Sequence, residues 1–308
     1  MVRATIDDVF FDESTNEAIR NSLPEAMITF FELFTHLGDG VALIVFATVL
    51  YWFGADSRRD RRALVIAIGL AALAISAGMK GIFLRPRPEL SGGYGGYSFP
   101  SAHAMGSAAF YAALAVIADT GTRRQRYAAA GMIIFLIALS RVVMGVHYVG
   151  DVVVGVAIGL ALVAIVVRGE RSEPGFVFGL AGAIAVLAYI LGSREFTTLT
   201  IGAALGATIA WQYIKDRHAR PRGAAILVLA YLCLPLLIAL RLVFGTGVIP
   251  GFGPLEIVGY AIATGAILVV PNVAERMNDW PPVEWLQDRL PFRGRTIDQE
   301  QVVSLSKD

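Results

Sequence analysis

One stretch decides the fold and the chemistry of this chain: Ser140-Arg-Val-Val-Met-Gly-Val-His-Tyr-Val-Gly-Asp151. It places a guanidinium, an imidazole and a carboxylate inside a run that is otherwise apolar. His147 and Asp151 have helical i, i+4 spacing, so on a helix they share one face. There the carboxylate can accept the imidazole Nδ1–H and leave Nε2 as an oriented nucleophile or base. Gly145 predicts a bend, so that Arg141 ends one helix and His147 opens the next.

The alternative interpretation of this stretch is a helix at the membrane border whose long charged side chains extend toward water. The rest of the chain favours chemistry, because more charged residues recur in a fixed order before it. Lys80 precedes Arg87-Pro88, and Pro100-Ser101-Ala102-His103 follows. With the 140–151 stretch, these segments read K-x6-R-P, P-S-x-H and S-R-x5-H-x3-D.

These ten residues at fixed spacing resemble the three signature motifs of the type 2 phosphatidic acid phosphatase superfamily. That superfamily also includes glucose-6-phosphatases and vanadium haloperoxidases. The motifs run from Lys80 to Asp151, and the resemblance implies a helical membrane core over residues 39–191. One position departs from the usual pattern, because Ala102 stands where the second motif commonly has Gly. That position would act through its backbone N–H, which Ala keeps, so we expect no loss of chemistry.

The resemblance also implies roles for individual side chains. His147 would attack phosphorus to form a phosphohistidine, with Asp151 orienting it, while His103 would protonate the leaving oxygen and then activate water. His103 has no acidic residue at helical spacing, which supports His147 as the nucleophile. We expect cationic side chains and the amino end of a helix to hold the phosphate. The expected phosphate-binding residues are Lys80, Arg87, Ser101, Ala102 and Arg141.

We expect no metal and no cofactor at this site. The motifs contain a single carboxylate, which is poor provision for a divalent ion. The expected reaction is therefore a metal-independent hydrolysis of a phosphate ester.

Composition predicts an integral membrane protein. Of the 308 residues, 56% are hydrophobic, and the mean hydropathy is +0.63. Soluble domains contain about 45–50% apolar residues. The net charge is +1, and the sequence contains no basic stripe with interleaved aromatic residues. We therefore expect no nucleic-acid partner. Cys233 is the one cysteine, so the chain forms no intrachain disulfide.

Hydropathy predicts an all-α fold, a polytopic bundle of about nine transmembrane helices. It would consist of a core like that of the resembled superfamily and further helices on its carboxyl-terminal side. Residues 24–37 are predicted to form an interfacial helix. The predicted spans are residues 39–53, 63–84, 100–118, 127–143, 147–167, 175–191, 198–214, 224–244 and 254–270. The predicted parts are an extracytoplasmic segment 1–38, a catalytic core 39–191, additional helices 192–271 and a cytoplasmic tail 272–308.

Arginine-rich loops set the expected orientation. When loops are counted alternately, every arginine-rich loop falls on one side, which the positive-inside rule makes cytoplasmic. The amino terminus and all three motifs then lie on the outer face of the cell membrane, and the carboxyl terminus lies inside.

Two phosphatase functions and one function from another class are the alternatives. The first is a phosphatase of phosphatidate-like lipids or polyprenyl (di)phosphates that arrive through the bilayer. The second is a phosphatase of soluble sugar phosphates. Nine spans resemble the glucose-6-phosphatase branch more than the six-span lipid phosphatases, but fold does not fix substrate. The third is a transporter or flippase, but its charged residues would gather near the bilayer midplane rather than at one face. The oligomeric state is open.

Four other residues and one loop have weaker interpretations. We interpret His36 and His218 as structural residues at the membrane borders. For Arg241 and Glu256, extension toward water is favoured over contact with substrate. The Gly-Tyr loop 91–97 is a flexible connection or, alternatively, a substrate lid.

Overall fold

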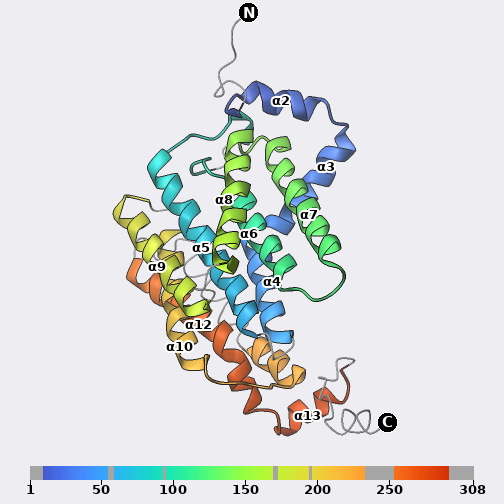
Figure 1. Ribbon diagram of the computed structural model, residues 1–308, viewed down its shortest axis with the longest axis vertical. Coiled ribbons are helices and arrows are strands. Elements are labelled where there is room, and N and C mark those ends of the chain that lie inside the picture. The colour runs from blue at the N-terminus through green and yellow to red at the C-terminus, as the bar shows by residue number, and fades with distance from the viewer. Residues whose placement is uncertain are drawn as a thin grey trace, which may run out of the picture.

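Helices are the regular elements throughout the part of the chain that the computed structural model describes, which confirms the all-α prediction (Figure 1). That part comprises residues 10–54, 59–92, 95–168, 173–193, 196–232 and 253–290. The helices are α2 (Glu13–Asn21), α3 (Glu25–Phe34), η1 (Thr35–Gly38), α4 (Gly40–Phe53), α5 (Arg59–Phe83), η3 (Glu89–Ser91), α6 (Ala102–Ile117), α7 (Arg123–Val143), α8 (Val149–Arg168), α9 (Pro174–Ile190), α10 (Thr197–Ile214), α12 (Gly253–Glu275) and α13 (Pro281–Gln287). Residues Gly223–Leu232 form a further short apolar helix.

Local sequence signals explain where several of these helices begin. Thr122 and Gln125 form a reciprocal capping box at the start of α7. The Ser101 side chain caps α6 by accepting from the Ala104 N–H. Glu173 caps α9, and Pro174 occupies its first turn, where its missing N–H is not needed.

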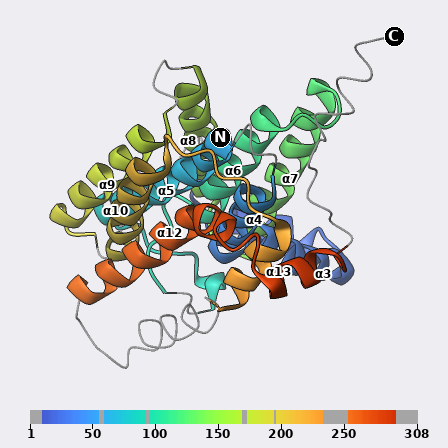
Figure 2. The same ribbon diagram turned by 90° about the horizontal axis from the view of Figure 1, so that it is seen from below.

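Small residues let the central helices approach closely. A Cβ at Gly155 of α8 would lie 2.8 Å from the Ser101 carbonyl oxygen, and one at Gly159 would lie 2.5 Å from that of Met105. These glycines therefore bring α8 against α6, which carries the second motif. Seen from below, α9 and α10 lie on one side of the bundle and α7 on the other, with α5, α6 and α8 between them (Figure 2).

The predicted count of nine spans is not confirmed. Four described helices, α5, α7, α8 and α12, are long and apolar enough to cross a membrane. A fifth span arises if α3–η1 and α4, which meet at 51°, are taken together. The helix predicted to be interfacial is therefore the first arm of this bent pair. Helices α6 and α9 are apolar but shorter than 18 residues.

The motif residues gather at one end of the bundle. Helix α7 begins with the arginine-rich segment at Arg123 and ends with Arg141, so these two groups lie at opposite ends of one helix. Figure 1 shows α2 at the end where α7 finishes and α13 at the other. The structure therefore separates the three motifs from the arginine-rich connection before α7. The predictions for Cys233 and Arg241, and part of the one for loop 91–97, lie outside the described residues.

Candidate active site

A bend at Gly145 shapes the third motif, as the sequence predicted. Helix α7 ends at Val143 and α8 begins at Val149. Gly145 has φ +66°, a left-handed conformation that glycine adopts without steric cost. A Cβ there would lie 2.6 Å from Cβ of Leu90, so both the backbone and the space favour glycine. His147 thus lies in the turn just before α8 rather than inside the helix.

The His147 ring is held between Asp151 and Arg87. Its Nδ1 lies 3.4 Å from Asp151 Oδ2, and its Nε2 lies 3.1 Å from an Arg87 guanidinium nitrogen. A guanidinium can only donate, so Nε2 must be the accepting, unprotonated nitrogen. The proton is then on Nδ1 and faces the carboxylate. The side chains of His147 and Asp151 are 2% and 0% exposed, so bulk water does not compete with this pairing. The same Asp151 oxygen accepts the Tyr148 N–H at 2.9 Å.

Three cationic side chains surround this imidazole. Lys80 occupies the last turn of α5, and Arg141 occupies the last turn of α7; both are buried. Burial, followed by the charges of Arg87, Arg141 and Lys80, holds the pKa of His147 well below its ordinary value of 6.5. The neutral form, which carries the Nε2 lone pair, is therefore the stable one. The structure brings all three predicted cations to one imidazole.

The amino end of α6 is tied to α8. Ser101 donates its backbone N–H to the Asp151 carbonyl at 3.0 Å. Of the two N–H groups expected to bind phosphate, that of Ser101 is therefore engaged in this structure, while its hydroxyl proton can still be donated. Ala102 is the first residue of α6, a position that alanine fills without strain.

His103 has an acidic partner that the sequence analysis missed. Its Nε2 lies 2.7 Å from Oδ1 of Asp39, which stands 64 residues earlier, between η1 and α4. The other Asp39 oxygen lies 2.7 Å from Nδ1 of His36. Helical spacing does not reveal such a tertiary pair. The available signal was a carboxylate at the edge of an apolar span, where ionisable residues tend to be functional.

The amino-terminal segment holds the third motif in place, which was also missed. The buried Asn16 amide of α2 donates to the carbonyls of Val142 and His147, at 3.1 and 2.8 Å. Arg20 donates to the Val143 carbonyl at 3.0 Å. The Thr35 hydroxyl of η1 accepts from Arg141 at 2.9 Å. Together these contacts anchor α2 and η1 to the bend that carries His147.

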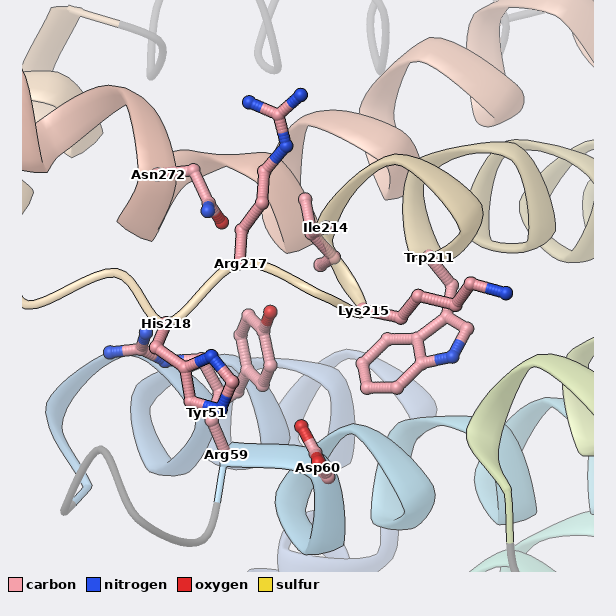
Figure 3. A pocket seen from close by; sticks show the side chains of 9 residues that line it. All are labelled: Tyr51, Arg59, Asp60, Trp211, Ile214, Lys215, Arg217, His218 and Asn272. Atoms are coloured by element: carbon pink, nitrogen blue, oxygen red, sulfur yellow. The ribbon is translucent and has the colours of Figure 1, made fainter.

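A separate polar pocket of about 70 Å³ lies away from these residues (Figure 3). Side chains of α4, α5, α10 and α12 line it, among them Arg59 of α5, and so do Lys215 and Arg217 of the segment after α10. His218, interpreted as structural, lies beside it, and none of its lining residues belongs to the three motifs. The pocket is therefore not the site that the motifs form.

Within the described ranges, no group of three or more His, Cys, Asp and Glu side chains is placed to hold a metal ion.

Glu256 accepts a hydrogen bond from the Thr198 hydroxyl at 2.9 Å, so it links α12 to α10.

Comparison with known proteins points to the same stretch of chain. Residues 60–172 match the family model described as "PAP2 superfamily". Over 72 residues the chain is 38% identical to a protein of Bacillus subtilis (strain 168) named phosphatidylglycerophosphatase B. That alignment covers 21% of this chain and 36% of the relative's length. No solved structure matches the chain. The matched family segment contains all three motifs.

Proposed function

We propose that this chain, which belongs to the PAP2 superfamily, is a membrane phosphatase that hydrolyses a lipid phosphate or polyprenyl (di)phosphate without a metal ion. The observation that carries the proposal is the fixed tautomer of His147, whose Nε2 lone pair lies beside Arg87. A phosphoryl group at that position would meet an aligned nucleophile and three positive charges. Such charges stabilise the oxygens of a transferring phosphoryl group.

The proposed reaction has two steps. In the first, His147 Nε2 attacks phosphorus, the ester P–O bond breaks, and His103 gives a proton to the leaving alkoxide. In the second, His103 takes a proton from water, the resulting hydroxide attacks phosphorus, and the P–N bond breaks. Phosphate leaves, and His147 is neutral again. Asp151 keeps the Nδ1 proton in place and stabilises the positive charge that the ring acquires during attack.

Two observations favour a lipid over a soluble sugar phosphate. The relative carries the name phosphatidylglycerophosphatase B. Lys80 and Arg141 lie in the last turns of apolar helices that are long enough to cross a membrane, where a lipid substrate would reach them from the bilayer. A transporter is not favoured, because the charged motif residues gather at one end of the bundle. The arginine-rich segment at the opposite end of α7 supports an extracytoplasmic site, by the positive-inside rule.

The test is phosphate release by purified protein in detergent with excess chelator. Substrates should include phosphatidylglycerophosphate, phosphatidate, a polyprenyl diphosphate and glucose 6-phosphate, with His147→Ala as control. We expect turnover of at least one lipid substrate that vanishes in the variant. A strict requirement for added Mg²⁺ would contradict the proposed mechanism, and preference for glucose 6-phosphate would contradict the substrate class.

A further inference from the structure

His36, Asp39 and His103 form a continuous hydrogen-bonded chain from the surface to the candidate site. The two contacts to the Asp39 carboxylate are both 2.7 Å long. The His36 side chain is 69% exposed, and that of Asp39 is 39% exposed. An ionised carboxylate only accepts, so each histidine donates the ring N–H that faces it.

The Asp39 carboxylate does not cap the helix that begins after it. Asp39 is the N-cap residue of α4, where an aspartate usually accepts a backbone N–H of the first turn. Among the described residues it makes no such bond, and both its oxygens face histidines instead. Helix capping therefore does not explain why this position holds a carboxylate.

The segment that presents Asp39 is fixed at several points. Thr35 bonds Arg141, and the Leu37 carbonyl accepts from the Tyr111 hydroxyl at 3.0 Å. A Cβ at Gly38 would lie 2.6 Å from the Ile137 side chain, so η1 packs tightly against α7. The carboxylate is thus held at His103 by the fold rather than by a mobile loop.

We propose that Asp39, steadied by His36, is a positioning residue that orients His103 for proton transfer to the leaving group. The proposal rests on the proposed function. Because Asp39 occupies Nε2 of His103, the other ring nitrogen, Nδ1, is the one that exchanges a proton with substrate and water. Nε2–H stays with the carboxylate throughout, and the negative charge stabilises the protonated ring before transfer. The same arrangement, a carboxylate fixing one nitrogen so that the other reacts, orients histidines in hydrolases.

The charged groups around His103 come from several elements. Arg141 of α7 and Arg87 of the loop after α5 act on it electrostatically, as does Asp39. His147 lies in the turn between α7 and α8. Asp39 is thus the one acidic group among these neighbours, and its removal would leave His103 with cations and another histidine.

Leaving-group dependence tests the proposal. Proton donation matters for an alkoxide and little for p-nitrophenolate, which leaves without help. Single-turnover cleavage should be compared for phosphatidate and p-nitrophenyl phosphate. General acid assistance is typically worth about 10²–10⁴ in rate, so we expect Asp39→Asn to slow phosphatidate cleavage about tenfold or more. Cleavage of p-nitrophenyl phosphate should stay within about threefold, on the same reasoning.

Controls separate positioning from folding. Glu32→Gln removes an exposed carboxylate from neighbouring α3 and should leave both rates unchanged. The double variant Asp39→Asn/His103→Ala should be no slower on phosphatidate than His103→Ala alone, because both changes remove one function. His36→Gln should shift the ratio of the two rates in the same direction by less. If Asp39→Asn does not fold, the ratio measured in His36→Gln tests the inference in its place.

Two results would overturn the inference while leaving the proposed function intact. One is an active wild type in which Asp39→Asn and His36→Gln leave both rates unchanged. The other is an equal loss on both substrates, which would indicate a structural role. A wild type that cleaves neither of these two substrates, nor phosphatidylglycerophosphate or a polyprenyl diphosphate, would instead contradict the proposed function itself.

Discussion

The protonation state of His147 is the residue-scale property on which the proposed reaction depends. Burial and the neighbouring charges of Arg87, Arg141 and Lys80 lower its pKa well below 6.5, so the reactive neutral form persists into mild acid. We therefore expect kcat/KM for p-nitrophenyl phosphate to keep its value as the pH falls through 6.5 and to decline only below it. Removing one cation makes protonation easier, so Arg87→Gln should move this acid limb to higher pH. An acid limb at or above pH 6.5 in the wild type would contradict the assignment.

Gly145 gives a second residue-scale prediction. Its φ of +66° and the 2.6 Å approach to Leu90 mean that Gly145→Ala must distort the turn that carries His147. Strained backbone of this kind costs about 1–3 kcal/mol, so we expect kcat/KM to fall about tenfold. The matched control is Gly131→Ala in α7, where a Cβ meets nothing within 4 Å. It should leave activity unchanged, and equal losses in both variants would refute the argument.

The sequence was most informative at this scale for residues within one motif. The bend at Gly145 follows from local conformation, and the approach of Asp151 to His147 was expected from their short separation in sequence. The two residues do not share a helix face, because His147 lies in the turn before α8. The partner of His103 does not, because Asp39 reaches it only when η1 packs against α6 and α7. Nothing in local spacing encodes that packing.

Helix α2 is the element whose importance was hardest to read from sequence. The segment before residue 39 was predicted to be separate from the catalytic core, yet Asn16 and Arg20 donate to three carbonyls of the third motif. Its pattern is that of an ordinary surface helix, with a polar face and one buried asparagine. Tertiary hydrogen bonds to backbone carbonyls leave no periodic signal. The length of a helix likewise depends on packing: within the described ranges, α6 and α9 are apolar as predicted but shorter than 18 residues, and four or five spans are found there.

Asn16→Ala tests whether α2 supports the site. The change removes two hydrogen bonds and leaves the Val142 and His147 carbonyls without this donor, at a cost of about 1–3 kcal/mol. We expect kcat to fall several-fold and the melting temperature to drop by a few degrees. Asn21→Ala, at the exposed end of the same helix, is the control and should change neither. Wild-type kinetics in Asn16→Ala would show that α2 is dispensable.

The orientation in the membrane is a prediction about the whole molecule. Gly95 precedes α6 and Gly121 follows it, so the two residues lie at opposite ends of that helix, and both are exposed. After replacement of Cys233, we expect Gly95→Cys to react with an impermeant maleimide in sealed cells. Gly121→Cys should react only after permeabilisation. The reverse pattern would place the candidate site on the cytoplasmic side.

The central claim is that His147, and not His103, becomes phosphorylated. The direct measurement is rapid quenching with p-nitrophenyl [³²P]phosphate, which reacts without a general acid. We predict an acid-labile, base-stable phosphoenzyme in the wild type and in His103→Ala, and none in His147→Ala. Label that survives in His147→Ala and disappears in His103→Ala would reverse the two roles and contradict the account.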